Sequence, residues 1–102
     1  MLKDFVQEEF DTDIKKGVVL LDFYSKTCGP CKMLAFILQD IEKIMGDQVK
    51  IIKIPFEENA SLVCEYQVEG YPTLIVLKNG KEVNRKSGLQ QKPVIIKMIE
   101  EA

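Results

Sequence analysis

Short apolar runs predict the strands of this chain. Val18 to Tyr24 is nearly continuous in apolar residues, which is typical of a strand buried on both faces of a sheet. Val49 to Ile54 is a second run of this kind. Thr73 to Leu77 and Glu82 to Ser87 predict two further strands, joined around Asn79-Gly80, which is the strongest short hairpin signal. A short strand is also expected within residues 1–6.

Apolar residues at helical spacing predict four helices. The longest covers Pro30 to Met45, with its proline in the first turn, where a missing N–H costs nothing, and Gly46 at its end. Its apolar face is expected to contain Leu34, Ile37, Leu38, Ile41, Ile44 and Met45. The other helices are expected over Glu8 to Lys16, ending at Gly17, over Ala60 to Tyr66 after an Asn59 cap, and over Pro93 to Glu101, with Ile95, Met98 and Ile99 as its core face.

The order of these elements predicts an α/β fold. Strands separated by helices in the first half of the chain imply parallel pairing through crossover connections, and the late hairpin adds antiparallel strands. We therefore expect a central mixed sheet of five (or four) strands with helices on both faces. A chain of 102 residues is long enough for one core, so residues 1–102 are expected to form a single domain.

Composition and charge narrow the classes of function. Fourteen basic and sixteen acidic residues give a net charge of −2, which is too small to favour a nucleic-acid or membrane partner. No stretch looks like a signal peptide or a membrane span. Three cysteines, an odd number, suit a reducing compartment better than a secreted disulfide scaffold, so we expect a cytoplasmic protein. The absence of histidine excludes Cys–His nucleophile pairs and histidine-rich metal sites.

The candidate chemistry lies where the first buried strand is followed by the longest helix. Cys28 and Cys31 are separated by Gly29-Pro30, and Cys28 falls just before the first helical turn. Unpaired N–H groups and the helix dipole stabilise an anion at this position, and the thiolate is the form of cysteine that attacks. Cys28 is therefore the expected nucleophile. Cys31, one turn further in, is expected to reach back to Cys28 while being more shielded from solvent.

The residues disfavour two other interpretations of this pair. A structural disulfide between Cys28 and Cys31 would close a loop too short to gain much from cross-linking. A zinc site needs four ligands, and Cys64 is the only remaining cysteine, so no metal is expected. Cys64 itself is expected to be a small buried hydrophobic residue. A regulatory or dimer-forming thiol is the alternative for that position.

The residues around Cys28 resemble the thioredoxin family. Its active-site motif is matched by Cys28-Gly29-Pro30-Cys31, and Phe10-Asp11-Thr12-Asp13 is similar to the first helix of the family. Further matches are Asp22-Phe23, Lys32, Lys53, Tyr71-Pro72-Thr73, Gly80 and Gly88. The resemblance spans nearly the whole chain, and it implies the thioredoxin fold, in which a mixed sheet is flanked by four helices.

The resemblance implies roles for the catalytic residues. Cys28 would attack a substrate disulfide, and Cys31 would resolve the mixed disulfide that forms. Asp22 lies in an otherwise apolar strand, where burial should raise its pKa toward neutrality, so that it can accept a proton from Cys31. Lys53, also in an interior strand, would tune that acid by its charge. The alternatives are a hydrogen-bonded buried carboxylate without a catalytic task for Asp22 and a lysine that reaches the surface for Lys53.

The resemblance also implies a surface for the substrate. Pro72 resembles the cis-proline opposite the dithiol in the family, and it would place the Tyr71 backbone where an extended substrate segment can pair with it. Gly70 and Gly88 would let a partner chain approach closely. The residues expected to contact the substrate are Thr27, Gly29, Pro30, Tyr71, Pro72 and Gly88.

One position departs from the family pattern. Family members typically carry tryptophan directly before the first cysteine, whereas this chain has Thr27 and no tryptophan at all. The loss of an indole removes apolar contact area beside Cys28, which bears on partner choice and reduction potential rather than on the basic chemistry. Tyr71 stands where the family usually has a smaller aliphatic residue, and it would replace part of the lost surface.

The sequence thus predicts a thiol–disulfide oxidoreductase. The favoured function is that of a monomeric cytoplasmic protein-disulfide reductase without a bound cofactor. Its expected partners are disulfide-containing protein substrates and, as electron donor, a thioredoxin reductase. One alternative is a thioredoxin-like protein with an altered redox potential that serves a dedicated partner. Another is a thioredoxin-fold adaptor module whose redox activity is incidental.

Overall fold

Five strands form one mixed sheet with the order β1-β3-β2-β4-β5 in a computed structural model that describes residues 1–102. The central strand β2 pairs in parallel with β3 and antiparallel with β4. The elements are, in chain order, β1 Leu2–Asp4, α1 Phe10–Asp13, β2 Val18–Tyr24, α2 Gly29–Met45, the 3₁₀ turn η1 Gly46–Gln48, β3 Lys50–Pro55, the 3₁₀ turn η2 Phe56–Glu58, α3 Ala60–Glu65, β4 Thr73–Lys78, β5 Lys81–Ser87 and α4 Lys92–Glu100. The predicted five-stranded α/β fold is confirmed.

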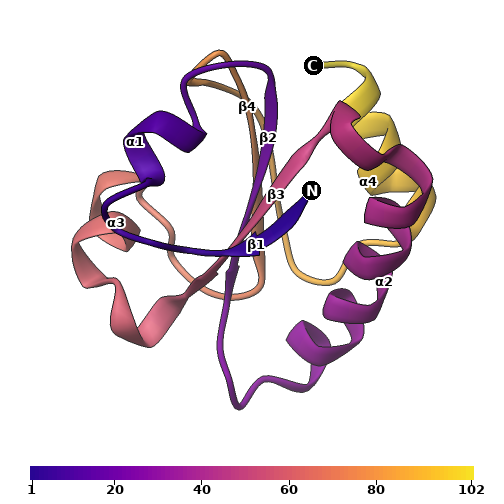
Figure 1. Cartoon of the computed structure of the whole chain (residues 1–102). Helices are drawn as coiled ribbons and strands as arrows, with labels where there is room; N and C mark the ends of the chain where they lie inside the picture. The colour runs from indigo at the N-terminus through magenta and orange to yellow at the C-terminus, as the bar shows by residue number, and fades with distance from the viewer.

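The helices lie in two layers on opposite faces of the sheet. Figure 1 shows α2 and α4 on one face and α1 and α3 on the other. Because side chains alternate along a strand, β2 contributes Leu20 to the apolar core beneath α2 and α4, and Val19 and Leu21 to the core beneath α1 and α3. A polar residue on β2 that lies two positions from Leu20 therefore faces the helix layer that contains α2.

The strongest sequence signals are matched closely by the structure. The strand β2 has the predicted bounds, and the residues between its two ends are buried. The hairpin between β4 and β5 turns at Asn79 and Gly80, whose φ angles are 51° and 86°. Two successive residues with positive φ are what a type I′ hairpin turn needs, which explains the Asn-Gly pair.

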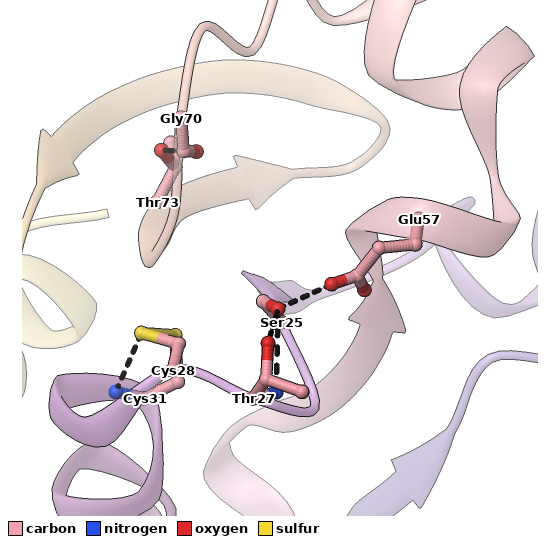
Figure 2. The surroundings of a disulfide bond; sticks show 7 residues. All are labelled: Ser25, Thr27, Cys28, Cys31, Glu57, Gly70 and Thr73. Carbon is pink, nitrogen blue, oxygen red and sulfur yellow. Dashed lines mark hydrogen bonds between the residues drawn. A yellow bond between two sulfur atoms is a disulfide. The ribbon is translucent and has the colours of Figure 1, made fainter.

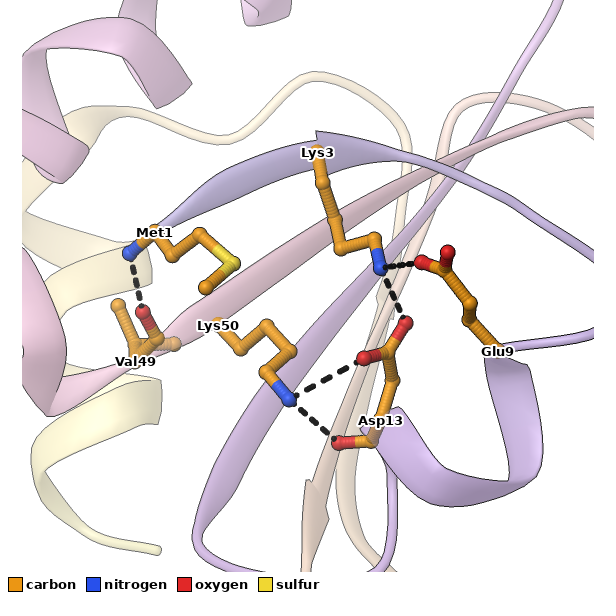
Figure 3. Close-up of polar contacts among 6 residues, drawn as sticks. All are labelled: Met1, Lys3, Glu9, Asp13, Val49 and Lys50. Carbon is orange, nitrogen blue, oxygen red and sulfur yellow. Dashed lines mark hydrogen bonds and ion pairs between the residues drawn. The ribbon is translucent and has the colours of Figure 1, made fainter.

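The first helix is shorter than predicted. It covers only Phe10–Asp13 rather than Glu8 to Lys16. Lys50 of β3 donates a hydrogen bond to the Asp13 carbonyl at 3.1 Å and lies 3.4 Å from its carboxylate, while Lys3 of β1 donates to the same carboxylate at 2.6 Å (Figure 3). A longer helix would use the Asp13 carbonyl for a hydrogen bond of its own, but Lys50 of β3 already donates to it.

These charges also determine the ionisation of Asp13. Burial raises the pKa of its carboxyl, but the hydrogen bonds from Lys3 and Lys50 outweigh that effect and hold the pKa below its usual value. Lys3 also pairs with Glu9 at 2.5 Å. The cluster ties β1 and β3 to α1.

Two smaller expectations about the helices are wrong. Ile44, predicted on the core face of α2, is 59% exposed, because the buried stripe runs through Leu34, Leu38, Ile41 and Met45. Asn59 precedes α3 at the N-cap position but makes no side-chain cap, since its amide donates to the Pro55 carbonyl at 2.9 Å. No helix of the structure has both the length and the apolar character needed to cross a bilayer.

Candidate active site

Cys28 and Cys31 form a disulfide at the N-terminus of α2 (Figure 2). Cys28 is the N-cap residue in extended conformation, and its sulfur accepts a hydrogen bond from the Cys31 N–H at 3.2 Å. In the reduced protein the same N–H would stabilise a thiolate on Cys28. Cys31 is only 4% exposed, whereas Cys28 is partly exposed. A partner molecule can therefore reach the sulfur of Cys28 more readily than that of Cys31.

Gly29 and Pro30 begin α2 and are both exposed. Proline in the first turn donates no hydrogen bond, and none is needed there. A Cβ added at Gly29 would meet no atom within 4 Å, so the space beside the disulfide is open at this position. Thr27, directly before Cys28, is exposed as well.

Asp22 is buried beneath the layer of helices that carries Cys31. Asp22 lies two positions after Leu20 on β2, so its side chain is on the same face of the sheet and points toward α2. It is only 1% exposed. Neither carboxylate oxygen has a hydrogen-bond partner. Burial raises the pKa of Asp22 to about 7, and the charge of Lys53 offsets part of this rise. The expectation of a buried acid with a pKa near neutrality is thus met, and the alternative of a hydrogen-bonded carboxylate is not.

Lys53 lies opposite Asp22 on β3 and is partly buried. Its ammonium is 4.8 Å from the centre of the Tyr24 ring, a distance at which a cation is attracted by an aromatic face. A small cavity of about 90 Å³ lies beside these side chains, and it is lined by Tyr24, Ser25, Lys26, Cys31, Lys32, Ala35 and Lys53. Lys53 and Cys31 therefore line the same cavity, whereas Asp22 does not line it.

The loop before β4 lies across from the disulfide. In Figure 2 the loop between Gly70 and Thr73 is drawn above the two cysteines, and the Thr73 hydroxyl donates to the Gly70 carbonyl at 2.8 Å. The peptide bond between Tyr71 and Pro72 is cis, as expected. Tyr71 is 47% exposed, and its N–H and C=O take part in no backbone hydrogen bond. The Tyr71 backbone is therefore free to pair with an added strand.

Gly88 supports this loop from the end of β5. Its N–H donates to the Pro72 carbonyl at 2.7 Å, and its φ is +84°, a conformation that side chains disfavour. Cβ atoms added at Gly70 or Gly88 would meet nothing within 4 Å. The space above both glycines is thus open.

Cys64 does not occupy the predicted environment. It is exposed and unpaired, so the expectation of a small buried hydrophobic residue is wrong. The residue lies on α3, beside an open groove of about 660 Å³ lined by Phe56, Glu57, Ala60, Val63, Cys64, Gln67, Val68, Glu69 and Tyr71. Helix α3 is short and buries no residue completely, which explains why a cysteine on it stays at the surface.

Sequence reasoning missed Ser25 and Glu57. Ser25 is 2% exposed, and its hydroxyl contacts the Glu57 carboxylate and the Thr27 hydroxyl (Figure 2). Ser25 and Glu57 are 32 positions apart in sequence, so no local motif could have linked them. A serine directly after an apolar strand was the only available signal.

Comparisons with known proteins agree with this geometry. A family model described as Thioredoxin matches residues 1–101. The chain is 39% identical to the Thioredoxin of Bacillus subtilis (strain 168) over 92 residues, which are 90% of this chain and 88% of that one. It is also 39% identical to the Thioredoxin of Chlamydia trachomatis over 99 residues, which are 97% of this chain and 96% of that one.

A solved structure gives the same result for the fold. A single-substitution mutant of the thioredoxin from Halobacterium salinarum NRC-1 superimposes with a TM-score of 0.88 at 34% sequence identity. The match covers 98% of this chain and 88% of the other. Sequence and fold thus point to one family over nearly the full length of the chain.

Proposed function

Since the chain belongs to the thioredoxin family and is a thiol–disulfide oxidoreductase, we propose that it reduces disulfides in other proteins, with Cys28 as nucleophile and Cys31 as resolving thiol. The observation that carries this assignment is the unequal exposure of the two cysteines at one helix N-terminus. Cys28 is partly exposed and caps the helix, while Cys31 is 4% exposed.

The reaction proceeds in two exchanges. The Cys28 thiolate attacks one sulfur of the substrate disulfide, so that a mixed disulfide forms and the other substrate sulfur leaves as a thiolate that takes up a proton. The Cys31 thiolate then attacks the Cys28 sulfur, which forms the Cys28–Cys31 disulfide and releases the second substrate sulfur. Two electrons pass from the dithiol to the substrate.

Asp22 is proposed to accept the proton that Cys31 must lose. A general base works best when its pKa lies near the operating pH, and burial raises the pKa of Asp22 to about 7. No other group of the protein donates a hydrogen bond to Asp22 in the oxidised form, so its oxygens are available. Because Asp22 does not line the cavity at Cys31, proton transfer would pass through a water molecule or a small side-chain movement. Lys53 moderates the pKa of Asp22 by its charge.

The substrate is proposed to bind as an extended segment along the Tyr71 backbone. The unused N–H and C=O of Tyr71 and the open space above Gly88 support strand addition at this edge. Thr27, Gly29, Pro30 and Pro72 complete the surface around Cys28. An extended segment held there would present its disulfide to the partly exposed sulfur.

The partners and location follow from this chemistry. We infer disulfide-containing proteins as substrates, a thioredoxin reductase as electron donor, no bound cofactor, and a cytoplasmic location. A reducing compartment suits an exposed free thiol such as Cys64, since such thiols are prone to oxidation elsewhere. We further propose that residues 1–102 act as a single monomeric domain.

One observation favours a second candidate function. Thr27 is exposed where the family typically has tryptophan, so the surface beside Cys28 is smaller and more polar. The alternative is a redox protein with an altered potential that serves one dedicated partner.

A reduction assay on a generic protein disulfide such as insulin, paired with a redox titration of the dithiol, distinguishes the candidates. A general reductase reduces insulin and has a potential near that of thioredoxin, about −270 mV. A strongly oxidising dithiol, or failure to reduce insulin, would reject the general reductase in favour of the dedicated one. Full biological activity of the Cys28→Ser, Cys31→Ser double variant would instead support an adaptor module.

A further inference from the structure

Ser25 connects the end of β2 to the segment that carries the nucleophile. Its backbone carbonyl accepts a hydrogen bond from the Cys28 N–H at 3.3 Å. Its hydroxyl oxygen lies 3.4 Å from the Thr27 nitrogen and 3.3 Å from the Thr27 hydroxyl, and it donates to the Glu57 carboxylate (Figure 2). The main chain of Ser25 therefore holds Cys28, and its buried side chain holds Thr27, the residue directly before the nucleophile.

The hydrogen-bonding capacity of this hydroxyl is fully used. A serine hydroxyl has one hydrogen to donate and two lone pairs that accept. A carboxylate only accepts, so the hydrogen of Ser25 goes to Glu57, and the Thr27 hydroxyl must be the donor in its contact with Ser25. A glutamate is ordinarily charged at neutral pH, and the hydrogen bond from Ser25 is the main cause that lowers the pKa of Glu57 further. The arrangement of Thr27 thus depends on Glu57.

The 3₁₀ turn η2, which carries Glu57, contacts both sides of the site. On one side, Lys26 forms an ion pair with Glu58 next to the Ser25–Glu57 hydrogen bond. On the other side, the rings of Phe56 and Tyr71 pack edge to face with their centres 5.2 Å apart. Both the segment before Cys28 and the loop before β4 are thus attached to the same three-residue turn.

We propose that Ser25 and Glu57 are positioning residues that, through η2, fix the separation between the Cys28 sulfur and the Tyr71 backbone. This inference rests on the proposed function, since the separation matters for a substrate that binds both groups at once. Thr27 takes part with its N–H and its hydroxyl, so the residue that departs from the family pattern belongs to the network. In this chain, polar contacts to η2 hold the segment that contains Thr27, the position at which family members typically have tryptophan.

The two kinds of substrate should respond differently to a loss of this network. A small aromatic disulfide needs only the exposed sulfur of Cys28. A protein disulfide must reach Cys28 while its chain pairs with Tyr71, and small errors of placement are costly for such a reaction. The network should therefore matter for protein disulfides and much less for small ones.

The test compares Ser25→Ala, Glu57→Leu and the double variant with the wild-type protein, all in the reduced form. For a protein disulfide, each single variant should lower the second-order rate constant by about three- to tenfold, the effect of losing one or two hydrogen bonds. The double variant should be no slower than the slower single variant, because the two residues act as one unit. For a small aromatic disulfide the change should stay below about twofold, since placement against Tyr71 is not needed.

Two further variants serve as controls. Glu57→Gln keeps an oxygen that accepts from Ser25 and should restore most of the lost rate. Ser61→Ala deletes the same atom from an exposed serine of α3 that makes no side-chain hydrogen bond, and it should behave as wild type. Additive effects of Ser25→Ala and Glu57→Leu, or equal losses toward both disulfides, would overturn the inference.

Amide hydrogen exchange of the oxidised protein gives a readout that needs no catalysis. Loss of the Ser25 hydroxyl or of Glu57 should speed exchange at Thr27 and Cys28 by about tenfold, because local opening becomes easier. Ser61→Ala should leave these amides unchanged. A wild-type protein that reduces no protein disulfide would reject the proposed function, whereas unchanged exchange in the Ser25 and Glu57 variants would reject the network itself.

Discussion

Asp22 of β2 and Lys53 of β3 occupy paired positions on the two parallel central strands, yet no hydrogen bond joins their side chains. The ammonium of Lys53 lies over the Tyr24 ring instead. Burial is therefore the main influence on Asp22 and raises its pKa to about 7, while the charge of Lys53 lowers it in part. Asp22 consequently changes its charge near neutral pH.

Asp22→Asn should stabilise the oxidised protein at alkaline pH. The native pKa of about 7 lies above the usual 3.8, so between these pH values the native state holds a proton that the unfolded chain releases. The stability that this group contributes is complete below about pH 4 and is lost as the pH rises through 7. Asparagine does not ionise, so the variant should exceed wild type by up to about 4 kcal/mol at pH 8. Denaturant unfolding at pH 4, 6 and 8 measures this difference, and a gap independent of pH would contradict it.

The same substitution should slow catalysis. Without the Asp22 carboxylate, Cys31 loses its proton less readily, so turnover with a protein disulfide at pH 7 should fall by at least about tenfold. Alkylation of Cys28 by iodoacetamide should stay fast, because Cys28 relies on the helix N-terminus. Comparing the two rates separates proton transfer from nucleophilic attack. Unchanged turnover would remove Asp22 from the mechanism.

Lys53→Met should raise the pKa of Asp22 further. The substitution removes the positive charge that offsets burial, and a rise of about half a unit to one unit is expected for a partly screened neighbouring charge. A carbon-13 titration of the Asp22 carboxyl by NMR measures the shift. Lys78→Met, at the exposed end of β4, is the matched control and should leave this pKa where it is. A pKa that does not move, or falls, would show that Lys53 has no electrostatic influence on Asp22.

Cys64 should be the only thiol that reacts in the native oxidised protein. It is exposed, while Cys28 and Cys31 are bonded to each other, so a maleimide should add once. Mass spectrometry counts the labels, and the reduced, unfolded chain should take three, one for each cysteine. The Cys64→Ser variant should take none in the oxidised form. Slow or absent labelling of the wild-type protein would mean that α3 shields this thiol.

Local patterns predicted the central elements well. Seven consecutive residues of β2 and the hairpin at Asn79-Gly80 have the expected positions, because continuous apolar runs and left-handed turn residues are properties of a few neighbouring residues. Helix α1 was predicted too long, since its end depends on Lys50, which comes from another strand. The exposure of Ile44 could not be read from spacing alone, because several apolar positions compete for one buried stripe.

The position of the chemistry follows from the order of residues along the chain. A buried strand, a Cys-Gly-Pro-Cys motif and a helix come directly after one another, so the two sulfurs must meet at a helix N-terminus. The surroundings of these sulfurs follow from the packing of the folded chain. Packing leaves Asp22 buried without a hydrogen bond, places Cys64 at the surface, and joins Ser25 to Glu57 across 32 positions. Whether a buried carboxylate finds a hydrogen-bond partner, whether a short helix is covered, and which distant side chains join all depend on how separate elements meet, and no local pattern encodes them.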